Sequence, residues 1–75
     1  MIHISARTIH ESHSGVTIDV MSQASYRVVI RADEAHIIAP GLDKLVELDE
    51  VVYPLEEPEA CAVMLVAQLE GGVEL

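Results

Sequence analysis

Residues 15–31, GVTIDVMSQASYRVVIR, contain two short runs in which apolar and polar side chains alternate, joined by the small-residue segment 22–25. A period of two is typical of a strand that buries one face and exposes the other. In the second run, Arg27 and Arg31 fall on the polar side while Tyr26, Val28 and Ile30 fall on the apolar side. Two such runs separated by a tight turn predict an antiparallel pair of strands, and this pair decides the fold class.

The preceding segment continues the same pattern. Ile2, Ile4 and Ala6 alternate with polar residues, so we expect a first strand that begins at Ile2. The segment 12–15, SHSG, has the small polar residues and the glycine that a chain reversal needs. Residues 35–39 are interpreted as a short fourth strand that ends at Pro40-Gly41. The sequence therefore predicts a small antiparallel meander of three to four strands, with one apolar face that needs a cover.

Residues 42–57 have a weaker pattern. Leu42, Leu45 and Leu48 lie at helical spacings with acidic residues between them, which predicts a short helix of one or two turns. For residues 50–53 the sequence pattern does not decide between a strand and a loop. Pro54 and Pro58 enclose a charged segment that suits a solvated connection.

The C-terminal segment has the strongest helical signals. Pro58 suits the first helical turn, Glu59 lies at the positive end of the helix dipole, and Gly71-Gly72 can end the helix. The rival interpretation is a buried strand over residues 63–66, but the alanines on both sides favour a helix. Because this helix is apolar on nearly all sides, we expect it to cover the sheet with one face and to meet a second copy or a partner with the other.

These elements predict one α+β domain over residues 1–75. We expect antiparallel strands in residues 1–31, an acidic connecting region with a short helix in residues 32–57, and a C-terminal helix in residues 58–71 that covers the sheet.

The chain is short, so its core is expected to be thin. It has 75 residues without Phe or Trp, and Cys61 is its only cysteine, which excludes an internal disulfide. Domains of this size are commonly stabilised by a partner or a second copy. The N-terminus lacks the pattern of a secretory signal, and the longest apolar run, residues 60–67, is far below the ~20 residues of a membrane-spanning helix. We therefore expect a cytoplasmic protein that does not bind membranes.

Charge divides the chain into two unlike parts. Of the net charge of −9, residues 1–31 contribute three arginines against two acidic residues, whereas residues 32–75 contribute one lysine against eleven acidic residues. Four basic residues cannot form the positive surface that phosphate binding requires, so direct binding of nucleic acid is not expected. The acidic second half instead favours a protein partner with a basic surface.

The sequence offers no convincing chemical site. His10 and His13, with His3 nearby, form the only histidine cluster, but His3 and His10 have opposite strand parity and would face opposite sides of a sheet. Cys61 lies between alanines in an apolar helix, where a cysteine usually behaves as a small core residue. We therefore expect no metal, no cofactor and no enzymatic activity.

The acidic tract, residues 43–59, is the one feature of the sequence that suggests a function, although it could also act only in solubility. The candidate contact residues are Asp43, Glu47, Glu50, Glu56 and Glu57. We predict a small inhibitor or adaptor that blocks a basic surface of a partner, where carboxylates take the place of nucleic-acid phosphates. Phage-encoded inhibitors of bacterial defence, including anti-CRISPR proteins, are an analogy of size and charge. The alternatives are a homo-oligomeric assembly module, such as a homodimer, and a metal-binding domain.

Overall fold

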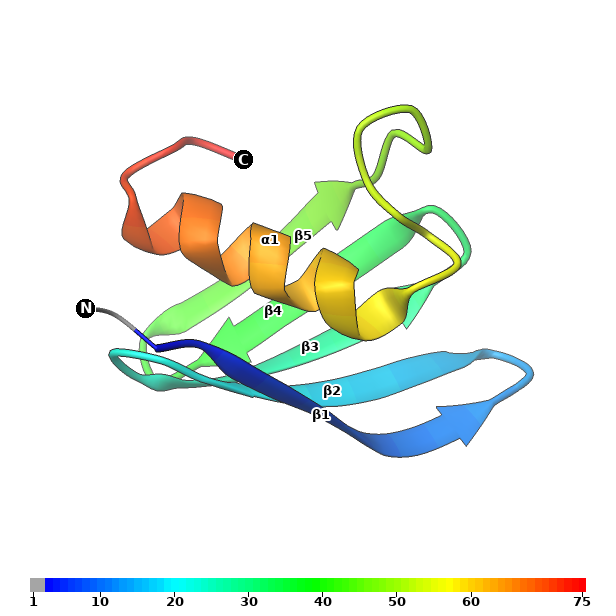
Figure 1. Ribbon diagram of the computed structural model, residues 1–75, viewed down its shortest axis with the longest axis horizontal. Coiled ribbons are helices and arrows are strands. Elements are labelled where there is room, and N and C mark those ends of the chain that lie inside the picture. Colours follow the sequence, from blue (N-terminus) through cyan, green and yellow to red (C-terminus); the bar gives the residue numbers. More distant parts are fainter. Residues whose placement is uncertain (1–2) are drawn as a thin grey trace.

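A computed structural model of the chain describes residues 3–75 and shows a five-stranded antiparallel sheet with one helix (Figure 1). The strands are β1 (Ser5–Ser12), β2 (Gly15–Met21), β3 (Ser25–Arg31), β4 (Glu34–Ala39) and β5 (Leu42–Glu47), and the helix is α1 (Pro58–Glu70). Each strand pairs with the next one along the chain, in the order β1-β2-β3-β4-β5. The predicted α+β class, the meander and the C-terminal helix are confirmed. The prediction of three to four strands falls one strand short.

The strand pair that decides the fold forms as its alternation predicts. Ile18 lies opposite Val28 and Val20 lies opposite Tyr26, so their side chains share one face of the sheet. The first strand also forms, but it begins at Ser5, and Ile2 lies outside the described residues.

The short helix predicted between residues 42 and 48 is wrong, because this segment forms β5. Pro40 and Gly41 make a two-residue turn that places Leu42 opposite Ala39, and the φ of 77° at Gly41 suits a residue without a Cβ. After this turn the chain runs antiparallel to β4, and β5 pairs with β4 over its whole length. A helix of two turns has no comparable support, since short helices are only marginally stable alone.

Residues 50–53 form a turn, not a strand. The backbone N–H groups of Val52 and Tyr53 both donate to the carbonyl oxygen of Asp49, at 2.9 and 2.8 Å. This local pattern leaves these residues without a place in the sheet. The connection from β5 to α1 is therefore a structured loop, which we call the acidic loop (residues 49–57).

Helix α1 ends as its glycines predict. The N–H of Gly72 donates to the carbonyl of Leu69 and the N–H of Val73 to that of Gln68, which is the Schellman arrangement. Gly72 holds the left-handed conformation that this ending requires, with φ 83°. No helix in residues 3–75 is long and apolar enough to cross a membrane.

The core lies between the helix and one face of the sheet, which we call the covered face (Figure 1). Helix α1 contacts β1, β2 and β3. The fully buried side chains with the largest volumes are Ile18, Ile37, Leu65, Val20, Val28, Val66 and Cys61. Burial of aliphatic groups of this size contributes about 1.5–3 kcal/mol each for the larger side chains, and this is the main force that holds the helix on the sheet.

Two carboxylates fasten the helix at its ends. Near the helix start, Glu59 accepts hydrogen bonds from the backbone N–H and the hydroxyl of Thr8, at 2.9 and 2.7 Å. At the last residue, Glu70 accepts from the hydroxyl of Ser22 at 2.6 Å, from the N–H of Gln23 at 3.2 Å and from the hydroxyl of Tyr26 at 2.9 Å.

These hydrogen bonds also shift the pKa values of the side chains that make them. The side-chain hydrogen bond from Thr8 lowers the pKa of Glu59, and the one from Ser22 lowers the pKa of Glu70. Burial, followed by the contact with Glu70, raises the pKa of Tyr26. Two of the acidic residues in the second half of the chain therefore serve the fold.

Candidate protein-binding surfaces

The structure divides the five carboxylates nominated from the sequence between two surfaces. Glu50, Glu56 and Glu57 lie in the acidic loop, where they line one shallow hollow of about 560 Å³. Asp43 and Glu47 lie on β5, and their side chains point to the opposite side of the sheet from the buried Val46. The proposed contact residues are therefore not one patch.

The acidic loop is held in shape by its own hydrogen bonds. The carboxylate of Asp49 accepts from the N–H of Val51 at 2.9 Å, which makes an Asx turn. The hydroxyl of Tyr53 donates to the side-chain oxygen of Gln68 at 2.9 Å and so ties the loop to the helix. The N–H of Glu57 donates to the carbonyl of Pro54 at 2.9 Å. The loop is thus a defined surface.

This loop exposes apolar side chains beside its carboxylates. Val51 is 87% exposed and Val52 is 55% exposed. Exposed valines next to a hollow lined by three carboxylates can contact the stems of lysine or arginine side chains while the carboxylates meet the charged ends. The loop therefore suits an amphipathic basic surface.

The second surface is the face of the sheet opposite the helix, which we call the open face. Side chains alternate along each strand, so this face carries the residues between the buried ones. Met21, Ile38 and Leu45 stand out on it, with exposed fractions of 54%, 40% and 63%. Exposed apolar side chains that gather on one face usually mark an interaction site.

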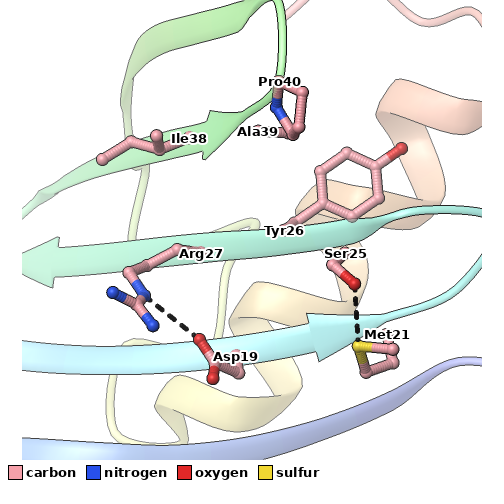
Figure 2. Close-up of a pocket in the computed structure, with 8 residues that line it drawn as sticks. All are labelled: Asp19, Met21, Ser25, Tyr26, Arg27, Ile38, Ala39 and Pro40. Carbon is pink, nitrogen blue, oxygen red and sulfur yellow. Dashed lines mark hydrogen bonds and ion pairs between the residues drawn. The ribbon is translucent and has the colours of Figure 1, made fainter.

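A shallow hollow of about 520 Å³ lies on the open face (Figure 2). In that view the helix lies behind the sheet, and Asp19, Arg27 and Ile38 lie in front of it. The guanidinium Nε of Arg27 is 3.2 Å from a carboxylate oxygen of Asp19, across the β2–β3 pair. Met21 and Pro40 complete the apolar part of its lining. A broad, shallow shape of this kind suits a protein surface better than a small molecule.

Charge is segregated across the open face. The β1–β3 half carries three arginines and one aspartate: Arg7, Arg27, Arg31 and Asp19. The β4–β5 half carries three carboxylates: Glu34, Asp43 and Glu47. Its histidine, His36, contacts the carboxylate of Asp43 through Nε2. One half of this face is therefore positive and the other negative.

Two carboxylates on the acidic half are direct cross-strand neighbours. Glu34 on β4 lies opposite Glu47 on β5, and both side chains are exposed. Like charges in this position destabilise a sheet. Their pairing opposes the stability of the isolated sheet, whereas Arg31 on β3, which also lies opposite Glu34, favours it.

The residues considered for chemistry are the histidines and Cys61. Within residues 3–75, no group of three or more His, Cys, Asp or Glu side chains is arranged to hold a metal ion. Cys61 is fully buried in the core, and this burial raises the pKa of its thiol, which disfavours the reactive thiolate.

The outer face of the helix, the alternative contact surface, is less apolar than its sequence suggested. Val63 and Met64 are half-buried, and the exposed positions are Ala60 and Ala67 besides Glu59. The large exposed apolar residues described by the structure lie on strands, on the acidic loop and in the C-terminal tail.

The open-face arginines and apolar residues were missed as contact candidates. The alternation around Arg27 and Arg31 could have identified these arginines as exposed, because it placed both on the polar side of a strand. Leu45 gave none, since its segment was interpreted as a helix.

Comparisons with known proteins found no relative: no protein-family model, no curated protein and no solved structure matches the chain.

Proposed function

We propose that the protein is a small, non-catalytic protein-binding module that recognises a basic surface of a partner through its acidic loop. The observation that carries the proposal is the pairing of exposed Val51 and Val52 with a hollow lined by Glu50, Glu56 and Glu57. Apolar contact supplies affinity and the surrounding carboxylates supply specificity and a fast encounter with positive partners.

The rest of the molecule supports this assignment. The loop is anchored to the helix through Tyr53, so its carboxylates are held in place before a partner arrives. Direct binding of nucleic acid remains disfavoured, because the loop would repel phosphates.

The finer form of the proposal is an inhibitor. Carboxylates displayed on a loop can occupy a surface that normally binds phosphates, as in the analogy with phage-encoded anti-CRISPR proteins. This form predicts that the chain weakens DNA binding by a CRISPR effector complex in a gel-shift assay. No effect on such complexes would remove the inhibitor form and leave the binding module.

A charge-reversal series tests the module itself. The probe is a synthetic peptide of alternating lysine and leucine, which has the chemistry that the loop suits. The variant E50K/E56K/E57K should lose binding, and affinity of the unchanged chain should fall as salt increases. The matched control is E34K/D43K/E47K, which has the same net charge but leaves the loop intact. Equal loss of binding in both variants would show that overall charge, not the loop, binds the peptide.

A further inference from the structure

The sheet ends in two edge strands, β1 and β5, and they are protected unequally (Figure 1). On β1, the carboxylate of Glu59 accepts from the backbone N–H of Thr8 at 2.9 Å, and the pairing with β2 shifts register between Thr8 and His10. A covering group and a bulge both keep a further strand from adding to an edge. In contrast, β5 pairs with β4 in unbroken register from Leu42 to Glu47. Of the two edges, β5 has the regular backbone that a further strand needs.

The hydrogen-bond pattern shows which backbone groups of β5 point outward. Just beyond β5, the N–H of Leu48 donates to the carbonyl of Asp33 at 2.6 Å, so these two residues form a hydrogen-bonded pair. Hydrogen-bonded and non-hydrogen-bonded pairs alternate along an antiparallel ladder, which directs the N–H and C=O of Asp43, Leu45 and Glu47 away from β4. Among residues 3–75, no backbone hydrogen bond outside the helix and the ladders uses these groups. Such a row of donors and acceptors is a template for another strand.

The side chains on this edge select the strand that can add to it. On the open face, Leu45 is 63% exposed, the side chain of Asp43 is 77% exposed, and Glu47 is exposed as well. The contact of Asp43 with His36 uses one of its two carboxylate oxygens. In an antiparallel pair, residues that exchange hydrogen bonds lie directly opposite each other, and opposite charges there are stabilising. The edge thus favours a strand with an apolar residue opposite Leu45 and basic residues opposite the two carboxylates.

We propose that the edge of β5 binds an extended segment of a partner protein, which adds to the sheet as a sixth, antiparallel strand. The segment has the sequence basic-x-apolar-x-basic, where x is any residue that a strand accepts. Main-chain hydrogen bonds supply the affinity in such strand addition, and the alternate side chains supply the specificity. This site is separate from the acidic loop and does not rest on the function proposed for it.

A second copy of the chain matches this edge poorly. Two β5 strands paired antiparallel around Leu45 would place Asp43 of each copy opposite Glu47 of the partner subunit, and like charges in this position are destabilising. The β1 edge of a second copy is no better, because Glu59 holds its N–H at Thr8. The charges therefore favour a segment of a different protein.

Two capped heptapeptides of the same composition test the proposal. In TKTVEKT, antiparallel pairing places the two lysines opposite Glu47 and Asp43 and the valine opposite Leu45. In TKTEVKT, the glutamate takes the place opposite Leu45, between the two carboxylates. TKTVEKT should bind at least about tenfold more tightly in an NMR titration, with the largest amide shifts at Asp43, Leu45 and Glu47. Equal affinities, or largest shifts within residues 49–57, would overturn the proposal.

Methylation of the peptide backbone separates strand addition from a contact of side chains alone. A methyl group on the valine nitrogen of TKTVEKT removes an N–H that points to β5, so binding should weaken at least about tenfold. The matched peptide has the methyl group on the glutamate nitrogen, whose N–H points away from β5, and it should bind within about threefold of the unmethylated peptide. Equal losses from the two methyl groups would overturn the pairing.

Charge variants distinguish this site from the acidic loop. D43K/E47K should lose TKTVEKT and bind the charge-reversed peptide TETVTET. The matched variant E56K/E57K has the same net charge and should keep TKTVEKT while it binds the lysine-leucine peptide less tightly. Loss of TKTVEKT in E56K/E57K but not in D43K/E47K would overturn the edge site and leave the acidic loop. If D43K/E47K does not fold, the methylated peptides decide on the unchanged chain.

Discussion

The two faces of the sheet are made by the same five strands, yet they follow different rules. On the covered face, neighbouring strands place aliphatic side chains opposite one another, as in the pair Ile18 and Val28. On the open face, they place charges and exposed aliphatics, including the like-charge pair Glu34 and Glu47. The first pattern buries apolar surface, whereas the second combines the ion pair of Arg27 and Asp19 with a like-charge pair that destabilises the sheet. The difference indicates that the covered face, more than the open face, holds the isolated chain in its fold.

The largest expected effect compares two adjacent residues of β4. Ile37 is fully buried on the covered face and Ile38 is exposed on the open face. I37A should lower the free energy of unfolding by about 2–5 kcal/mol through lost burial and a cavity. I38A should change it by about 0.5 kcal/mol or less. Urea denaturation at low protein concentration measures both, and equal losses would remove the distinction between the faces.

The next effect concerns the fastening of the helix to the sheet. E70Q replaces a carboxylate that accepts three hydrogen bonds, from Ser22, Gln23 and Tyr26. Charged acceptors make the stronger hydrogen bonds, so the variant should unfold at a lower temperature. The control is E74Q in the exposed C-terminal tail, which should leave the melting temperature unchanged. If E74Q lowers the melting temperature as much as E70Q does, the loss comes from the change in net charge and not from the hydrogen bonds of Glu70.

Acid should weaken the covered side through the same carboxylates. The pKa values of Glu59 and Glu70 are lower in the folded chain than their ordinary value of 4.5. A lowered pKa in the folded state means that these groups contribute stability above about pH 4.5 and lose it as the pH falls through their folded-state values. Denaturation midpoints between pH 7 and pH 3 should fall in the unchanged chain and fall less in E59Q/E70Q. Parallel curves for the two proteins would contradict this role.

Alkali should act through Tyr26. Its pKa is raised in the folded chain, so its contribution is present below the ordinary value of 10.0 and is lost as the pH rises through the folded-state value. Y26F should remove this alkaline dependence in the same unfolding assay. An unchanged alkaline profile in Y26F would assign the dependence to another group.

The smallest effect has the opposite sign. E47K replaces one member of the like-charge pair on the open face with a residue that Glu34 attracts, so the isolated chain should become more stable by about 0.2–1 kcal/mol. Chemical denaturation at low concentration measures this gain. A loss of stability would show that Glu47 supports the fold.

The sequence was sufficient to predict the elements whose periodicity is regular. Residues 15–31 contain two runs in which apolar and polar side chains largely alternate, and the helix has proline and glycine at its two ends. In β5 the pattern fails, because Lys44 lies on the covered side and Leu45 on the open side, the reverse of what a strand pattern requires. The fifth strand therefore became visible only through its pairing with β4.

The candidate surfaces were predictable only in part. Charge alone identified the carboxylates of the acidic loop, since they lie close together in sequence. Charge could not show that Glu59 and Glu70 serve the fold and not a contact surface. Their hydrogen-bond partners on β1, on β3 and in the β2–β3 turn lie more than 40 residues away in sequence. The open face required the registers of five strands, because Arg7 and Asp43 join one row only through three strands between them.

The most direct test of the contrast between the faces is the exposure of the isoleucine methyl groups to a soluble paramagnetic agent, measured by NMR. We expect strong relaxation at the methyl groups of Ile38 on the open face and little at those of Ile18 and Ile37 on the covered face. Equal relaxation at Ile37 and Ile38 would contradict the division of the sheet into a covered face and an open face.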